Sequence, residues 1–125
     1  MMVRSFADLD FKVLPGRLSA DPFAGSDSAG TSARVVRIEP GGPRSAHRHP
    51  RSAEVVYVAE GAGRAWQEGE AQRVSGGDMV FVPRGVPHAT VPDPDSALLL
   101  VCFFPDPDLV TNLEELDTVI DLGAV

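Results

Sequence analysis

The three histidines of this chain and one glutamate are spaced so that they could bind a single metal ion. His47 and His49 are separated by one residue, so on an extended strand both imidazoles project from the same face. Glu54 follows five residues later, and Pro50 interrupts the strand between them, which lets the chain return the carboxylate to that face. His88 comes from a distant segment, directly after a proline-bounded turn. The four side chains therefore form one candidate site.

The donor types restrict the metal that such a site would hold. Three neutral imidazoles and a carboxylate suit Fe, Mn, Co, Ni, Cu or Zn, whereas Ca and Mg favour shells made of oxygen. We therefore expect one divalent transition metal ion bound by His47, His49, Glu54 and His88, and we treat Glu54 as both a ligand and a candidate catalytic base. A barrel that kept this cluster without a metal is the less favoured alternative, because the polar groups would be buried without compensation.

Short β-branched runs separated by Gly and Pro dominate the chain from Ala33 onward. The runs expected to be strands cover residues 33–39, 54–59, 64–67, 70–74, 79–82, 88–91 and 97–104. Their spacing is typical of an all-β sandwich or barrel. Connections of hairpin length between them predict sequential antiparallel pairing.

Two motifs in this region resemble those of the cupin superfamily. The first has the form G-x5-H-x-H-x3,4-E-x6-G and is matched by Gly41, His47, His49, Glu54 and Gly61. The second has the form G-x5-P-x-G-x2-H-x3-N and is matched by Gly77, Pro83, Gly85 and His88, with Pro92 in place of the usual Asn. The resemblance covers about residues 31–104. It implies a single antiparallel β-barrel or jelly roll, often dimeric, with the metal inside one end.

A length of 125 residues suits one domain, so we expect no second catalytic domain. We divide it into an N-terminal segment and loop (1–30), the cupin barrel (31–104) and an acidic tail (105–125). Residues 19–32 are rich in Ala, Ser, Gly and Asp and are expected to form a surface loop, with a lid over a nearby pocket as the sharper interpretation. The stretch Thr111–Glu114 matches a capping box, which predicts a short helix from about Asn112.

Charge and hydropathy exclude several classes of function. The net charge is −7, and residues 85–125 contain eight acidic residues and no basic one. Without a basic stripe we expect neither nucleic-acid nor anionic-membrane binding. The longest apolar run, Ala97–Phe104, is too short to span a bilayer. The acidic N-terminus does not resemble a signal peptide, and the single Cys102 cannot form an intrachain disulfide, so we expect a cytoplasmic protein.

The surroundings of the candidate site are expected to be mostly apolar. Val56 and Val58 share the inward face of the strand that begins at Glu54, and such walls exclude water and admit a small organic substrate. Four arginines flank the site segments and could meet an anionic substrate, although a solvated rim is the favoured interpretation: Arg44, Arg48, Arg51 and Arg84.

The resemblance implies an enzyme that acts on a small organic molecule bound at or beside the metal. Small cupins include dioxygenases, polyketide cyclases, lyases, decarboxylases and isomerases. Among these, oxygenase chemistry and cyclisation or isomerisation are the reaction types that we favour. The alternative is a non-catalytic ligand sensor or storage-type barrel. Because the run 97–104 is apolar on both alternating faces, we also expect a cover over its outer face, either the N-terminal segment or a second copy in a homodimer.

Overall fold

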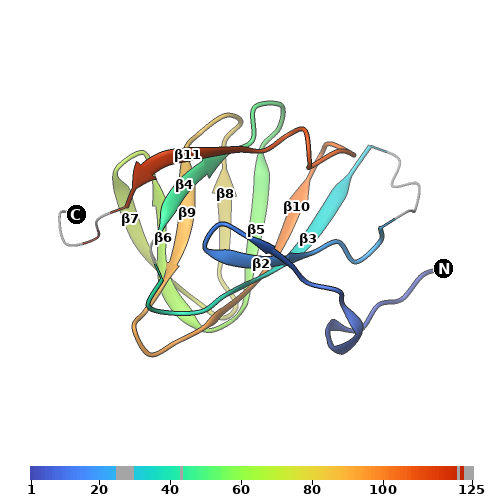
Figure 1. Cartoon of the computed structure of the whole chain (residues 1–125), viewed down its shortest axis with the longest axis horizontal. Coiled ribbons are helices and arrows are strands. Elements are labelled where there is room, and N and C mark those ends of the chain that lie inside the picture. The colour runs from blue at the N-terminus through green and yellow to red at the C-terminus, as the bar shows by residue number, and fades with distance from the viewer. Residues whose placement is uncertain (25–29, 43, 121, 123–125) are drawn as a thin grey trace.

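Eleven β-strands make up almost all of the regular structure in the computed structural model, which describes residues 1–24, 30–42, 44–120 and 122. The strands are β1 (Lys12–Leu14), β2 (Arg17–Ala20), β3 (Ser32–Ile38), β4 (Ser45–Arg48), β5 (Glu54–Glu60), β6 (Ala62–Gln67), β7 (Glu70–Ser75), β8 (Met79–Val82), β9 (His88–Pro92), β10 (Leu98–Phe104) and β11 (Glu114–Val119). They form two antiparallel sheets, ordered β1-β2-β3-β10-β5-β8 and β11-β4-β9-β6-β7 (Figure 1). The predicted all-β jelly roll is confirmed.

Alternation along the strands builds the core between the sheets. On β5, Val56 and Val58 are buried, whereas Tyr57 between them is 38% exposed. β10 pairs with β3 on one side and β5 on the other, and its inward side chains Leu98, Leu100 and Cys102 join the same core. The expected inward face of β5 is therefore correct.

The N-terminal segment adds two strands to the larger sheet. A single 3₁₀ turn (η1, Phe6–Asp8) precedes β1, and the β1–β2 hairpin pairs with β3 through β2 (Figure 1). Of the predicted loop 19–32, residues 19 and 20 belong to β2 and Ser32 begins β3. Residues 25–29, on which the lid interpretation also depends, lie outside the described residues. No helix of the described residues is long and apolar enough to cross a membrane.

The predicted C-terminal helix from Asn112 is wrong, because residues 114–119 form strand β11 beside β4. The Thr111 hydroxyl donates to the Asp108 carboxylate, so Thr111 belongs to a turn and does not cap a helix. The next residue, Asn112, is fully buried and bonded to Ser52 and Arg51. Tertiary partners thus override the local capping signal.

The outer surface of strands β10, β5 and β8 is apolar and partly exposed. Two cross-strand rows make up this outer apolar face: Val101, Tyr57 and Met79 in one, and Phe103, Val55 and Phe81 in the other. Met79, Phe81 and Phe103 are 70%, 63% and 49% exposed. The expected cover over the outer side of β10 is therefore incomplete within one chain.

Gly61, at the turn between β5 and β6, lies very close to the neighbouring backbone. Its φ is +93°, and a Cβ placed on it would lie 2.0 Å from the Ala97 carbonyl oxygen. Gly69 has a similar φ of +88°, but a Cβ placed there would meet open space. Gly69→Ala should cost about 1–2 kcal/mol through backbone strain, and Gly61→Ala should cost about 1–3 kcal/mol more through overlap. Urea unfolding measures both, and equal losses would contradict the close approach.

Candidate metal centre

Pairing between β4 and β9 brings the first histidines together. His47 on β4 and His88 at the start of β9 are direct Cα partners in the smaller sheet. His49 follows the end of β4, and Glu54 begins β5 in the opposite sheet after the Pro50 turn. The structure therefore brings together all four residues that the sequence predicted, and we call them the quartet.

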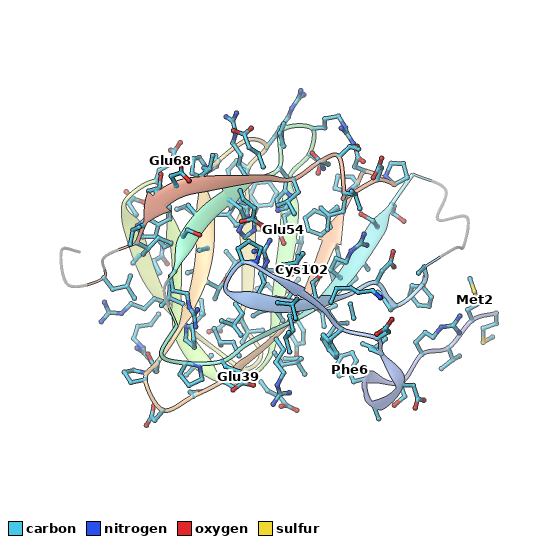
Figure 2. The ribbon with its side chains drawn as sticks, in the orientation of Figure 1. Met2, Phe6, Glu39, Glu54, Glu68 and Cys102 are labelled. Carbon is cyan, nitrogen blue, oxygen red and sulfur yellow. The ribbon has the colours of Figure 1, made fainter. Side chains whose placement is uncertain are left out.

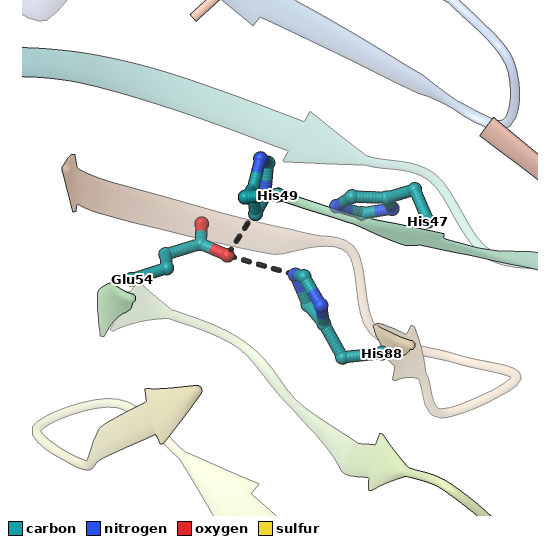
Figure 3. Close-up of side chains that lie close together, drawn as sticks. All are labelled: His47, His49, Glu54 and His88. Atoms are coloured by element: carbon teal, nitrogen blue, oxygen red, sulfur yellow. Dashed lines mark hydrogen bonds and ion pairs between the residues drawn. The ribbon is translucent and has the colours of Figure 1, made fainter. Parts of the chain in front are cut away.

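The quartet is compact and largely buried (Figure 3). One donor atom from each residue lies within 4.8 Å of the others. The Nε2 of His88 is 2.8 Å and that of His49 is 3.3 Å from the same Glu54 oxygen. His49, Glu54 and His88 are each at most 4% exposed, whereas His47 is only partly buried. The side of the quartet nearest His47 is therefore the more accessible one.

Main-chain carbonyls orient two of the imidazoles. The Nδ1 of His49 donates to the Asn112 carbonyl oxygen at 2.9 Å, and the Nδ1 of His88 donates to that of Val86 at 2.9 Å. A proton held on Nδ1 leaves the Nε2 lone pair available. Both Nε2 atoms face the same Glu54 oxygen, so a metal ion placed among the three would take the two Nε2 lone pairs and the carboxylate together.

Asn112 is a positioning residue that the sequence analysis misassigned to a helix. Its side-chain oxygen accepts from the Arg51 backbone N–H at 2.7 Å, and its amide donates to the Ser52 hydroxyl at 2.8 Å. It thus holds the segment between His49 and Glu54 in addition to His49 itself. The only signal in the sequence was a polar residue ahead of an alternating stretch, which does not reveal a partner about 60 residues away.

Burial and mutual contact shift the ionisation of the quartet. Burial alone would raise the pKa of Glu54, but the contacts with His49 and His88 outweigh it and hold that pKa well below its usual range. Burial, followed by the charges of His88 and Arg17, lowers the pKa of His47 well below 6.5. Glu54 is therefore a carboxylate and His47 a neutral imidazole near neutral pH. These are the protonation states needed for binding a metal.

The donor set fits one divalent transition metal ion. At metal distances of about 2.0–2.2 Å, neighbouring donors of one ion lie about 3 Å apart and opposite donors about 4.2 Å apart. In the structure the four donor atoms lie within 4.8 Å of one another, so small movements of the side chains would bring them to these separations. The His49 Nε2 is buried with no hydrogen-bond partner among the described residues, since its contact with Glu54 is long and poorly directed. An ion at the centre would satisfy that atom.

Small cavities adjoin the quartet, and their walls combine apolar side chains with cations. One cavity of about 40 Å³ is lined by His47, Glu54 and His88 together with Val36, Ile38, Val56, Leu100, Thr90, Cys102 and Arg17. Burial raises the pKa of the Cys102 thiol, which therefore serves as a neutral wall. A larger cavity of about 700 Å³ borders the outer apolar face at Val55 and Phe103, and none of the quartet lines it.

Most of the arginines expected around the site are engaged elsewhere. Arg48 pairs with Glu114 and Arg51 with Asp106, while Arg84 donates to the Pro50 carbonyl oxygen. Of the predicted four, only Arg44 lines a cavity beside His47. The sequence analysis missed Arg17 and Arg34, which line the cavities at the quartet, because neither belongs to a motif.

Acid should weaken both the fold and metal binding. Because folded His47 has a lowered pKa, an unfolded chain binds more protons below about pH 6.5, so the free energy of unfolding falls as the pH falls. The contribution of Glu54, whose folded pKa is depressed, is lost only in much stronger acid. We expect metal loss and a lower melting temperature between about pH 6 and 5. Elemental analysis and calorimetry measure these, and metal retention with an unchanged melting temperature at about pH 4.5 would contradict the assignment.

Comparisons with known proteins place these features in a family. Residues 34–104 match the model of the cupin domain. Germin-like protein 3-8 of Oryza sativa subsp. japonica is 35% identical over 75 residues, which cover 56% of this chain and 33% of the rice protein. The chain thus spans about a third of the length of this curated relative.

Solved structures agree with the fold. KdgF from Halomonas sp. is 28% identical with a TM-score of 0.68, covering 86% of this chain and 96% of its own. The polyketide cyclase RemF from Streptomyces resistomycificus is 20% identical with a TM-score of 0.73, and the match covers 99% of this chain and 90% of the RemF chain. Oxalate decarboxylase of Bacillus subtilis, which contains Mn(II) centres, is 26% identical with a TM-score of 0.67. The match covers 80% of this chain and 27% of the decarboxylase chain. With its family model matched over more than half of its length, the chain belongs to the cupin domain family.

Proposed function

We propose that this protein is an enzyme that acts on a small organic molecule bound at or beside a divalent metal ion held by His47, His49, Glu54 and His88. The observation that carries the proposal is the cavity that adjoins three of these four residues. A purely structural ion would be enclosed by protein atoms, whereas a catalytic one keeps positions open to a ligand. His47, the least buried member, marks the side from which a ligand approaches.

A bound ion would polarise a substrate oxygen or acidify a water molecule. The residues around it supply orientation and exclude water. Val36, Val56 and Leu100 form apolar walls that limit competition by bulk water. Glu54 has a strongly lowered pKa and is therefore a weak proton acceptor, which favours its role as a charged ligand over that of a general base.

Two reaction types remain within the proposal. The likeness to a polyketide cyclase supports redox-neutral cyclisation or isomerisation, and the likeness to a manganese-containing decarboxylase supports chemistry at a redox-active ion, which includes dioxygenase reactions. The metal taken up in the cell separates them, because zinc would favour the redox-neutral class and iron or manganese the other. The alternative is a sensor or storage barrel that binds a ligand without turnover. The buried, unpaired Cys102 supports a cytoplasmic location.

The test combines metal content with two substitutions in the quartet. Protein purified without added metal should contain one ion per chain by elemental analysis. His49→Ala should lose it, whereas Glu54→Gln, which keeps the shape of the side chain, should retain part of it and change reactivity at least about tenfold. Turnover is followed by mass spectrometry on small organic acids and polyketide-like phenols, with and without chelator.

Two outcomes would count against this function. An ion bound to a different set of residues would remove the quartet as its site. A fully metallated protein that binds these compounds but transforms none of them would leave the sensor or storage alternative.

We further propose that two copies associate through the outer apolar face. Its two cross-strand rows contain no charged side chain, so a second copy of the same face is a matching partner in a symmetric dimer. Phe103 and Phe81, at 49% and 63% exposure, would become buried.

The dimer is tested by one charge placed on each of two exposed apolar positions. Phe103→Glu should convert a dimer to a monomer, since a buried unpaired charge costs several kcal/mol. Val119→Glu, at an equally apolar position that is 75% exposed on β11, is the matched control and should leave the dimer intact. Light scattering at micromolar concentration measures the mass. A wild-type monomer would remove the proposal.

A further inference from the structure

We propose that Arg17 recognises a carboxylate group of the small molecule bound beside the quartet, which makes the substrate an organic anion. This inference rests on the proposed function and names its substrate class. Arg17 lies on β2, in the hairpin that precedes the matched cupin region of residues 34–104. The recognition element therefore comes from outside the part of the chain that the family model describes.

Arg17 is a largely buried cation at the wall of the site. Its side chain is only 11% exposed, and it lines all three small cavities that contain His47. A guanidinium in such a place is costly without an anionic partner.

A second guanidinium strengthens the positive potential of the cavity. Arg34 on β3 is the Cα partner of Cys102, and its side chain is 14% exposed. It lines the same cavity as Arg17, His49 and Glu54. Glu54 is the single carboxylate among the residues lining that cavity, while Arg34 pairs with Asp21 at 3.3 Å and Arg17 with Glu115 at 2.7 Å. A divalent ion would therefore bring two positive charges against the one negative charge of Glu54, which leaves an excess of one positive charge. An anionic ligand would balance it.

The partner that Arg17 now holds lies at the edge of the site. Its Nη2 donates to the Glu115 carboxylate at 2.7 Å, and its Nη1 donates to the Pro15 carbonyl oxygen at 2.8 Å. Glu115 is on β11 directly opposite His47, and its side chain is 31% exposed. Figure 1 shows the β1–β2 hairpin and β11 crossing the barrel on the same side. The Glu115 carboxylate thus binds the Arg17 guanidinium at a position that a ligand carboxylate can take instead.

The geometry of arginine suits this exchange. The guanidinium has five N–H donors in a rigid fork that matches both oxygens of a carboxylate, and the contacts with Pro15 and Glu115 use two of these donors. Neighbouring Glu54 cannot take the same role, because its oxygen already faces His49 and His88. A ligand carboxylate would bridge the space between Arg17 and the quartet, where Arg17 and His47 line three small cavities of about 40, 30 and 40 Å³.

The test measures binding of malonate and of its neutral analogue malonamide by calorimetry, on both the metal-free and the Zn(II)-loaded protein. Wild type should bind malonate more tightly than malonamide in both forms. Arg17→Gln should weaken malonate binding about tenfold or more, and Arg17→Lys, which keeps the charge but not the fork, should fall between. Glu115→Gln should tighten binding, because the competing carboxylate is gone.

Arg48→Gln is the matched control. Arg48, on β4, forms an ion pair at 2.8 Å with Glu114 of β11, the residue before Glu115 and on the opposite face of that strand. The substitution should leave malonate binding and metal content unchanged. This variant separates anion recognition from the loss of any ion pair that links β11 to the strands beside it.

Each outcome supports or overturns the role of Arg17. Malonate binding that is unaffected by Arg17→Gln, or weakened equally by Glu115→Gln, would overturn the inference and show that the ion pair is structural. Arg17-dependent malonate binding in the metal-free protein supports the role of Arg17. If the protein also binds no metal ion, only the proposed metal-dependent function is contradicted. A normal metal content with no Arg17 dependence leaves the proposed function standing and removes this inference.

Discussion

Four polar donors, three of them buried, gather between two sheets and impose the main physical constraint on this protein. Transfer of such groups out of water is unfavourable unless each finds a partner. Glu54 meets this demand through a hydrogen bond with His88, and the imidazoles of His49 and His88 meet it on their far sides through the carbonyls of Asn112 and Val86. What remains is the Nε2 of His49, whose lone pair points into the cluster without a hydrogen bond among the described residues. A metal ion would satisfy that atom, and the surrounding structure holds the donors in place for it.

The fold supplies this arrangement by joining both sheets at the site. His47 and His88 come from paired strands of one sheet, and Glu54 comes from the other. Figure 2 shows Glu54 and Cys102 near the middle of the barrel, where the inward side chains of both sheets meet. Because β5 begins at Glu54, the same strand that carries the carboxylate continues into the apolar core through Val56 and Val58. Movement of the quartet therefore requires movement of the core.

The terminal segments contribute what the central barrel lacks. The barrel over residues 34–104 contains the quartet, whereas Arg17 and Asn112 come from the segments before and after it. Asn112 orients a histidine, and Arg17, which pairs with Glu115, lines the cavities at the quartet. In a fold that hosts many activities, function depends on such additions to a shared scaffold. Metal binding and the proposed choice of substrate are in this way carried by different parts of the chain.

The sequence alone determined the fold class, most strand positions and the four donors of the quartet. These features are local: alternation of apolar residues, turn residues at short intervals, and donor types at fixed spacing within two motifs. The tertiary structure decided the rest. Residues 114–119 pair with β4 despite a helix-capping pattern, because Asn112 finds partners at Ser52 and Arg51, about 60 residues away. Arg17 and Arg34 reach the quartet only because β2, β3 and β10 lie side by side, and no local pattern records which strands become neighbours.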